Sequence, residues 1–141
     1  MNHLVVDASV VVKWVLPERG EEADVDKALG ILEGIKASNI VIHQPLHWLA
    51  ETAAVIERLS PDTAAADIQD LYDLNFEIVD GRELYLKACE ISTKLNHHLF
   101  DTLYHAAALL LGDAVLVTAD RKYFKKAQAY GNIALLENAE F

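Results

Sequence analysis

The sequence predicts an α/β fold in which helices cover both faces of a five-stranded parallel sheet, giving three layers (α/β/α). Short apolar runs of strand length alternate along the chain with longer segments of helical periodicity, and this alternation is typical of parallel sheets with right-handed crossovers. The apolar runs are continuous, as in strands that are buried on both faces. Two of these runs end on a carboxylate that leads directly into a helix, at Asp7 and at Asp120.

The composition is that of an ordinary globular protein, and we expect residues 1–141 to form one domain. The chain is 52% hydrophobic and 24% charged, which excludes a disordered or low-complexity protein. Its longest strongly apolar run, residues 106–111, is far shorter than the roughly 20 residues of a membrane span. Cys89 is the single cysteine, so no internal disulfide is possible, and no spacing resembles a zinc site. We therefore expect a cytoplasmic protein.

The charge of the chain limits how it can contact nucleic acid. With 22 acidic and 12 basic residues the net charge is −10, which excludes a wide basic face of the kind that coats nucleic acid. The exception is one local cluster, formed by Arg121, Lys122, Lys125 and Lys126. We expect any contact with nucleic acid there, although an ordinary solvated helix face remains an open alternative.

The first third of the chain predicts two strands and two helices. The apolar run that begins at Leu4 and ends on Asp7 predicts a buried strand, which passes into a helix at 10–16. The Pro-Glu-Arg-Gly sequence at 17–20 interrupts the helical pattern. Apolar residues then recur at helical spacing from 21 to 35. Residues 39–43 predict a second buried strand, which stops before Pro45.

The central part predicts three further helices and one strand. Residues 46–59 are apolar or small except for a narrow polar strip that includes Glu51. A helix start at residues 60–62 precedes an amphipathic helix that extends to about residue 74, and residues 76–80 predict the third strand. The helix that follows ends near residue 95.

A helix that is apolar almost all round is expected at residues 100–111, where Asp101 breaks the pattern. A carboxylate on a buried helix is costly unless a donor or a cation matches its charge. His97 and His98 precede this helix, and we expect them to form a solvated turn. The helix ends at Gly112.

The last part repeats the opening pattern. Residues 114–120 predict a buried strand that ends at Asp120 and leads into a short basic helix. Residues 133–136 then predict the fifth strand.

Each candidate carboxylate also has a purely structural interpretation. Asp7 precedes a helix and Asp101 lies near the start of one, so either is suited to an N-cap. Glu51 follows His47 by four residues, which suits an exposed pair on one helix face.

Together, however, four carboxylates can converge on one crevice. Strands of a parallel sheet present their carboxyl ends at one edge, where ligands collect, so Asp7 and Asp120 are expected to meet there. Glu51 and Asp101 lie on helices that follow other crossovers. Four carboxylates either raise some of their pKa values or bind a cation. Oxygen ligands alone select Mg²⁺ or Mn²⁺, and these ions commonly serve phosphodiester hydrolysis.

At these residues the whole chain resembles the PIN domain family, in particular the VapC-type ribonuclease toxins of prokaryotic toxin–antitoxin pairs. The resemblance rests on Val6-Asp7-Ala8-Ser9 with Lys13-Trp14, on Glu51, on Phe100-Asp101-Thr102-Leu103-Tyr104, and on Thr118-Ala119-Asp120-Arg121, in that order.

The resemblance implies a PIN-like fold and a metal-dependent endoribonuclease that uses Mg²⁺ or Mn²⁺. Its catalytic and metal-binding residues would be Asp7, Glu51, Asp101 and Asp120, with Ser9 and Thr118 in support. The RNA backbone would be held by Arg121, Lys122, Lys125 and Lys126, with Lys13 and Trp14 beside the entrance. The implied partners are RNA, a cognate antitoxin and a second copy of the chain.

Three other classes of protein share part of this pattern. A receiver-like Mg²⁺-binding signalling domain would use Asp80 as its phospho-acceptor, but no acidic pair follows the first strand, and Glu137 and Asn138 stand where its lysine is required. A haloacid-dehalogenase-like phosphatase requires a second aspartate where Ser9 stands. A non-catalytic module that keeps the PIN fold to hold a protein partner remains open.

Overall fold

The computed structural model describes residues 1–16 and 22–141, so the interruption expected at residues 17–20 lies outside the described residues. The strands are β1 (Asn2–Val6), β2 (Ile40–Pro45), β3 (Glu77–Val79), β4 (Ala114–Thr118) and β5 (Ile133–Leu135). The α-helices are α1 (Ala8–Val15), α2 (Glu22–Lys36), α3 (Trp48–Leu59), α4 (Ala64–Asp73), α5 (Arg82–Leu95), α6 (Leu99–Leu111) and α7 (Arg121–Ala127). Two short 3₁₀ helices, Gln128–Tyr130 and Leu136–Asn138, flank β5.

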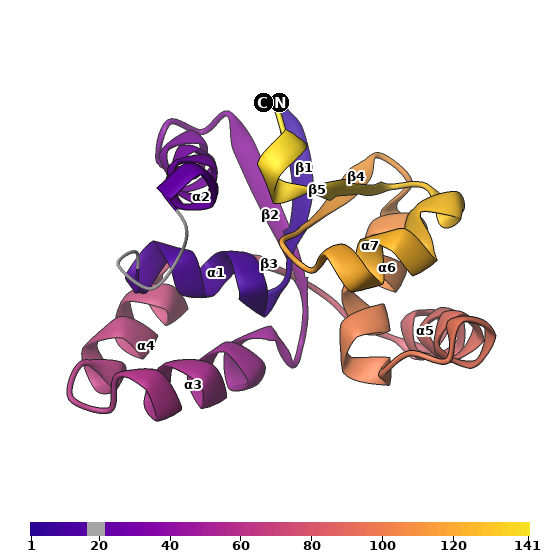
Figure 1. The fold of residues 1–141 in the computed structure, drawn as a ribbon, viewed down its shortest axis with the longest axis horizontal. Coiled ribbons are helices and arrows are strands. Elements are labelled where there is room, and N and C mark those ends of the chain that lie inside the picture. The colour runs from indigo at the N-terminus through magenta and orange to yellow at the C-terminus, as the bar shows by residue number, and fades with distance from the viewer. Residues whose placement is uncertain (17–21) are drawn as a thin grey trace.

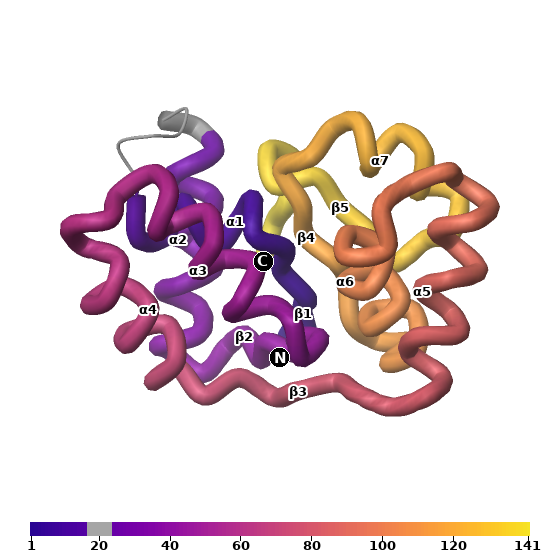
Figure 2. The backbone as a smooth tube through the Cα atoms, turned by 90° about the horizontal axis from the view of Figure 1, so that it is seen from below, coloured from indigo at the N-terminus to yellow at the C-terminus, as the bar shows by residue number. Residues whose placement is uncertain are grey.

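These elements form the predicted three-layer α/β/α fold around a five-stranded parallel sheet. In Figure 1 the helices α1–α4 lie on the left of the strands and α5–α7 on the right. Figure 2 shows β3 crossing below the other strands to connect α4 with α5. Among the described residues, no helix has both the length and the apolar character needed to cross a membrane.

The strand order β3-β2-β1-β4-β5 places a topological switch point between β1 and β4. Strands β2 and β3 lie on one side of β1, and β4 and β5, which come later in the sequence, lie on its other side. The strand order therefore reverses between β1 and β4. In open α/β sheets, ligand sites form outside the carboxyl ends of the strands at such a point. Val6, the last residue of β1, lies opposite Val117 of β4, so both strands end at nearly the same level.

Burial explains the continuous apolar runs. Leu4, Val5 and Val6 are all almost fully buried although successive strand residues face opposite sides of the sheet, because helices cover both sides. On one side α6 packs against β1, β2 and β4. Residues 102–108 of this helix are all buried, which accounts for its apolar character all round.

A buried glutamine fixes the end of β1. The backbone pairing between β1 and β2 extends to Leu4 and Ile42, and beyond it the Gln44 side chain replaces the ladder. Its Nε2 donates to the Val6 carbonyl at 2.7 Å, and its Oε1 accepts from the Val6 amide at 3.0 Å. Both polar atoms of the Gln44 side chain are thereby satisfied. The amide and the carbonyl of Val6, the residue directly before Asp7, are both fixed by these hydrogen bonds.

Several predicted boundaries differ from the structure for local reasons. Helix α1 begins at Ala8 rather than at residue 10, because Asp7 already caps it. Helix α4 begins at Ala64 after a hydrogen-bonded turn, whose Ser60 and Thr63 hydroxyls are 2.6 Å apart. Strand β3 has only 3 residues, since it is an edge strand with a single neighbour.

Candidate metal centre

Asp7 is the first residue after β1 and the N-cap of α1. Its Oδ1 accepts from the Ser9 amide at 3.1 Å and also from the Ser9 hydroxyl. Its Oδ2 accepts from the Thr118 hydroxyl at 2.5 Å. The capping interpretation of Asp7 is therefore correct, but a carboxylate has about four acceptor positions, so capping leaves room for a further partner.

Ser9 and Thr118 join the ends of β1 and β4. The Ser9 hydroxyl accepts from the Ala119 amide at 3.0 Å, and the Thr118 hydroxyl accepts from the Asp120 amide at 3.0 Å. Each hydroxyl thus accepts from the β4 side and donates to Asp7. The two side chains fix the Asp7 carboxylate relative to the loop that carries Asp120.

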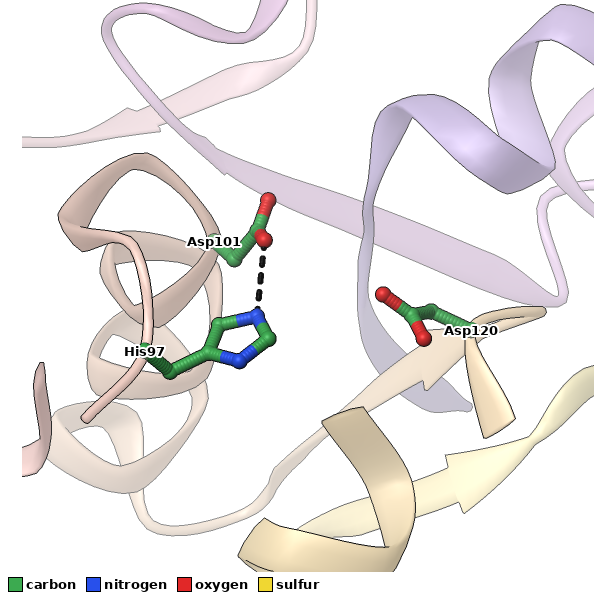
Figure 3. Close-up of side chains that lie close together, drawn as sticks. All are labelled: His97, Asp101 and Asp120. Carbon is green, nitrogen blue, oxygen red and sulfur yellow. Dashed lines mark hydrogen bonds and ion pairs between the residues drawn. The ribbon is translucent and has the colours of Figure 1, made fainter. Parts of the chain in front are cut away.

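Asp120 lies two residues after the end of β4 and is the N-cap of α7, where its Oδ1 accepts from the Tyr123 amide at 3.0 Å. Its carboxylate points toward Asp101 and His97 (Figure 3). One ligand atom from each of these three residues lies within 4.8 Å of the others, and they form the one such group of three among the described residues.

Asp101 is not a helix cap. The N-cap of α6 is His98, whose ring Nδ1 accepts from the Phe100 amide at 3.2 Å, whereas Asp101 is the third residue of the helix. The Oδ2 of Asp101 lies 2.8 Å from His97 Nε2 (Figure 3). The prediction of a solvated turn is wrong for His97, because its side chain is only 11% exposed.

Glu51 lies in the first turn of α3, and its Oε1 accepts from the Tyr104 hydroxyl at 3.0 Å. Its Oε2 is 3.9 Å from His47 Nε2. Burial lowers the pKa of His47 below its ordinary value, so this imidazole is neutral at pH 7. The helix pair considered from the spacing therefore contributes little, and Tyr104 is the main partner of Glu51.

Burial and shared charge couple these carboxylates. Burial raises the pKa of Asp7 to about 6; the bonds from Ser9 and Thr118 oppose the rise, and the charges of Asp101 and Asp120 add to it. The pKa of Glu51 is raised by burial and by the charges of Asp101 and Asp7, while the Tyr104 bond lowers it.

Tyr104 is the neutral donor within this cluster. Burial and the charges of Glu51 and Asp7 raise its pKa far above the usual range. The hydroxyl therefore keeps its proton at neutral pH and donates it to Glu51.

The predicted basic cluster is divided between two environments. Arg121 forms two hydrogen bonds with Glu137, at 2.9 and 2.6 Å. Lys126 reaches the Asn96 carbonyl at 3.4 Å and His97 Nδ1 at 3.3 Å, beside the carboxylates. The remaining two lysines of the cluster are exposed on α7.

Near the start of the chain, Lys13 and Trp14 differ in their surroundings. Lys13 lies one helical turn after Ser9, and both line a cavity of about 340 Å³ between α1 and α3. Trp14 is a core residue, and the expectation that it flanks the entrance is wrong. Its side chain is 7% exposed, and its Nε1 donates to the Ala28 carbonyl at 2.7 Å.

Residues 4–129 match the PIN domain family. The chain belongs to the PIN domain family. PIN domains are generally nucleases that require a divalent metal ion. The receiver-like alternative is therefore wrong, and Asp80 follows the edge strand β3, with β2 between it and β1.

A solved structure with the same fold is the crystal structure of PAE2754 from Pyrobaculum aerophilum. The TM-score is 0.65 at 17% sequence identity, and the match covers 96% of this chain and 90% of that chain. At this identity the likeness concerns the fold. No curated protein matches the chain.

The residues of this PIN domain fit the divalent ion that the family generally binds. The carboxylates of Asp7, Glu51, Asp101 and Asp120 act on one another electrostatically, and a cation relieves such repulsion. Carboxylate oxygens are the ligands that Mg²⁺ and Mn²⁺ prefer.

Two residues of the site were given no role from the sequence. Tyr104 follows Asp101 by three residues, which places both on one helix face, and this spacing was a usable signal. His97 precedes Asp101 by four residues, but the two are separated by the start of α6, so helical spacing did not apply.

Proposed function

We propose that this PIN domain is a VapC-type endoribonuclease that hydrolyses RNA phosphodiester bonds with Mg²⁺ or Mn²⁺, and that it is the toxin of a toxin–antitoxin pair. The observation that carries the proposal is the electrostatic coupling of Asp7 with Asp101 and Asp120 at the switch point of the sheet. The sequence motifs around Asp7 and Asp101 support the VapC-type assignment.

The four carboxylates of Asp7, Glu51, Asp101 and Asp120 would hold the ion. When bound, a divalent ion of this kind supplies an activated water and neutralises negative charge on the scissile phosphate. Ser9 and Thr118 fix the Asp7 carboxylate through its two oxygens.

Two further residues orient the other ligands. Tyr104 donates to Oε1 of Glu51, so this oxygen is held in place and Oε2 is left to bind the ion. His97 bonds Asp101 in the same manner. The protein thus presents its carboxylates already oriented, which reduces the cost of ordering them when the ion and RNA bind.

RNA as the substrate is supported by the surroundings of the carboxylates. Lys122 and Lys125 are exposed on α7 and can neutralise backbone phosphates. Phe100, next to Asp101, is half exposed and lines a cavity of about 250 Å³ together with His47 and Tyr85. Aromatic side chains of this kind stack on unpaired bases, which favours single-stranded RNA.

The proposed partners are a second copy of the chain and a cognate antitoxin. Exposed Leu46, Tyr72 and Ile78 line a further apolar cavity beside the edge strand β3. Exposed apolar side chains grouped in this way are typical of protein interfaces. Light scattering of the purified chain tests the dimer, and co-expression with the product of the adjacent reading frame tests the antitoxin.

The decisive experiment is cleavage of total cellular RNA with Mn²⁺ or Mg²⁺, with and without EDTA, by the wild type and by Asp101→Asn. We expect metal-dependent cleavage by the wild type and a loss of about 100-fold or more in the variant, as when a charged group that stabilises the transition state is removed. Asn preserves the shape and an acceptor for His97, and Asp101 caps no helix, so the fold is retained.

Asp70→Asn is the matched control, because it removes an exposed carboxylate on α4. Cleavage by Asp101→Asn at close to the wild-type rate would refute the assignment of the site. An inactive but folded wild type would instead favour the non-catalytic interaction module.

A further inference from the structure

His97 is held between a lysine and an aspartate of the candidate centre. Its Nδ1 lies 3.3 Å from Lys126 Nζ, and its Nε2 lies 2.8 Å from Asp101 Oδ2. Helix α5 ends at Leu95 and its C-cap Asn96 adopts the left-handed conformation with φ 51°, so His97 lies in the short connection to α6. The imidazole packs against the Tyr123 ring at a centroid distance of 4.7 Å.

The two neighbours of the ring select the same tautomer. An ammonium group has three donors and no acceptor, so the ring nitrogen that faces Lys126 must accept. With Nδ1 accepting from Lys126, the ring proton lies on Nε2. This nitrogen faces the Asp101 carboxylate, which is an acceptor, so the hydrogen bonds at both ends of the ring agree.

The tautomer decides what His97 can do at the centre. Nε2 is the ring nitrogen that lies 2.8 Å from Asp101 Oδ2, and a ring nitrogen of His97 lies within 4.8 Å of carboxylate oxygens of Asp101 and Asp120, a spacing that a metal ion can bridge. A nitrogen that carries a proton has no lone pair to give to a metal. With an imidazole ligand the centre would favour Ni²⁺ or Zn²⁺ more strongly over Mg²⁺.

We propose that Lys126 keeps His97 in the Nε2–H tautomer, so that His97 positions Asp101 as a hydrogen-bond donor and the centre stays an all-oxygen site selective for Mg²⁺ and Mn²⁺. Lys126 is then a specificity-determining residue of the metal centre. The inference rests on the carboxylate metal centre of the proposed function but not on RNA cleavage.

The first test reads the tautomer directly and needs no metal. Long-range ¹H–¹⁵N correlation spectra in EDTA distinguish protonated from unprotonated ring nitrogens, and comparison with His97→Gln assigns the His97 signals. We expect an unprotonated Nδ1 in the wild type and in Lys126→Arg, which keeps a cationic donor. In Lys126→Met only Asp101 still favours Nε2–H, so the population of the Nδ1–H tautomer should rise above its wild-type level. A protonated Nδ1 in the wild type would overturn the inference.

The second test measures metal affinity by calorimetry with Mg²⁺, Mn²⁺ and Ni²⁺ in the absence of RNA. In Lys126→Met we expect the ratio of Ni²⁺ to Mg²⁺ affinity to rise about tenfold or more, the size typical of changes beside metal ligands. The added change His97→Gln should abolish that rise. Lys36→Met is the matched control, since it removes one positive charge at the end of α2.

Three outcomes separate the possibilities. If Lys126→Met leaves the ratio unchanged, Lys126 does not control the tautomer and the inference is wrong. If His97→Gln alone lowers Ni²⁺ affinity in the wild-type background, His97 is already a metal ligand and the inference is also wrong. Binding of Mg²⁺ or Mn²⁺ without any RNA cleavage would refute the proposed function and leave the inference standing, whereas absence of any binding would refute both.

Discussion

Replacing Asp7 with Asn is expected to stabilise the metal-free protein at pH 8 but not at pH 4. Burial and the neighbouring carboxylates raise the pKa of Asp7 from 3.8 to about 6 in the folded chain. The fold therefore favours the protonated acid, and the contribution to stability is fully present below pH 3.8 and is lost as the pH rises through 6. Asn carries no charge at any pH and does not suffer this loss.

The magnitude follows from the size of the shift. A difference of about 2 pH units corresponds to about 3 kcal/mol. Because Asp7 is only half-buried in the folded chain, screening by water reduces this to roughly 2 kcal/mol. Asn retains an oxygen that can accept from the Ser9 amide. The altered bond to Thr118 costs about 1 kcal/mol at every pH. It therefore offsets the difference in unfolding free energy between the two proteins by a constant and does not change how that difference depends on pH.

The assay is urea unfolding of the wild type and of Asp7→Asn in EDTA at intervals from pH 4 to pH 8. Taking the difference between the two proteins cancels the titration of the other groups. We expect this difference to move by about 2 kcal/mol in favour of the variant as the pH rises. Asp70→Asn should give a difference that does not depend on pH. A flat difference for Asp7→Asn as well would refute the argument that the fold strains this carboxylate.

Saturating Mn²⁺ at pH 8 should then reverse the order of stability. An ion that binds only the folded chain stabilises it by about 2.7 kcal/mol at 100 times its dissociation constant. Asp7→Asn lacks one carboxylate ligand and should gain much less. Equal gains in the two proteins would show that Asp7 does not contact the ion.

The remaining predictions concern RNA. The double change Lys122→Ala and Lys125→Ala should reduce the salt dependence of RNA binding. For two lost contacts to a single strand, the steepness of log K against log salt should fall by about 1.4. Filter binding at several KCl concentrations measures this slope, and an unchanged slope would show that the two lysines face solvent without contacting RNA. Phe100→Leu should weaken binding of single-stranded RNA by about 1–3 kcal/mol while Mn²⁺ affinity stays the same, and unaltered RNA affinity would show that no base stacks there.

The fold was predictable because its pattern is local. Continuous apolar runs, an aspartate at the end of two strands and a helix stop at Gly112 are all properties of neighbouring residues. Helix α6 and strand β4 follow this pattern closely, and β1 begins at Asn2, before the predicted start at Leu4. The order of the strands was not predictable in the same way, because right-handed crossovers are compatible with adding a strand on either side of β1. Pairing across β1 depends on long-range packing, which includes the Gln44 side chain.

The candidate site was predictable only where position along an element implies position in space. Asp7 and Asp120 both follow strands of one parallel sheet, so the sequence could place them at the same edge, whereas the pairing of β1 with β4 brings them together. His97 and Lys126 are 29 residues apart, and nothing in the local pattern of either indicates that they flank one another. Trp14 shows the opposite error, because its place beside Lys13 in the sequence suggested a surface role that its burial excludes.

Helix capping and metal binding make compatible demands on Asp7 and Asp120. Each caps a helix through a carboxylate oxygen, which places both negative charges at the positive ends of α1 and α7, where the helix dipole favours them. The same two helices thus position the carboxylates and moderate their repulsion before any cation arrives. For Asp7 the moderation is incomplete, since its pKa still rises to about 6. A divalent cation can relieve the remaining unfavourable free energy of the charged Asp7 carboxylate. Metal binding at the switch point of the sheet should therefore stabilise the fold.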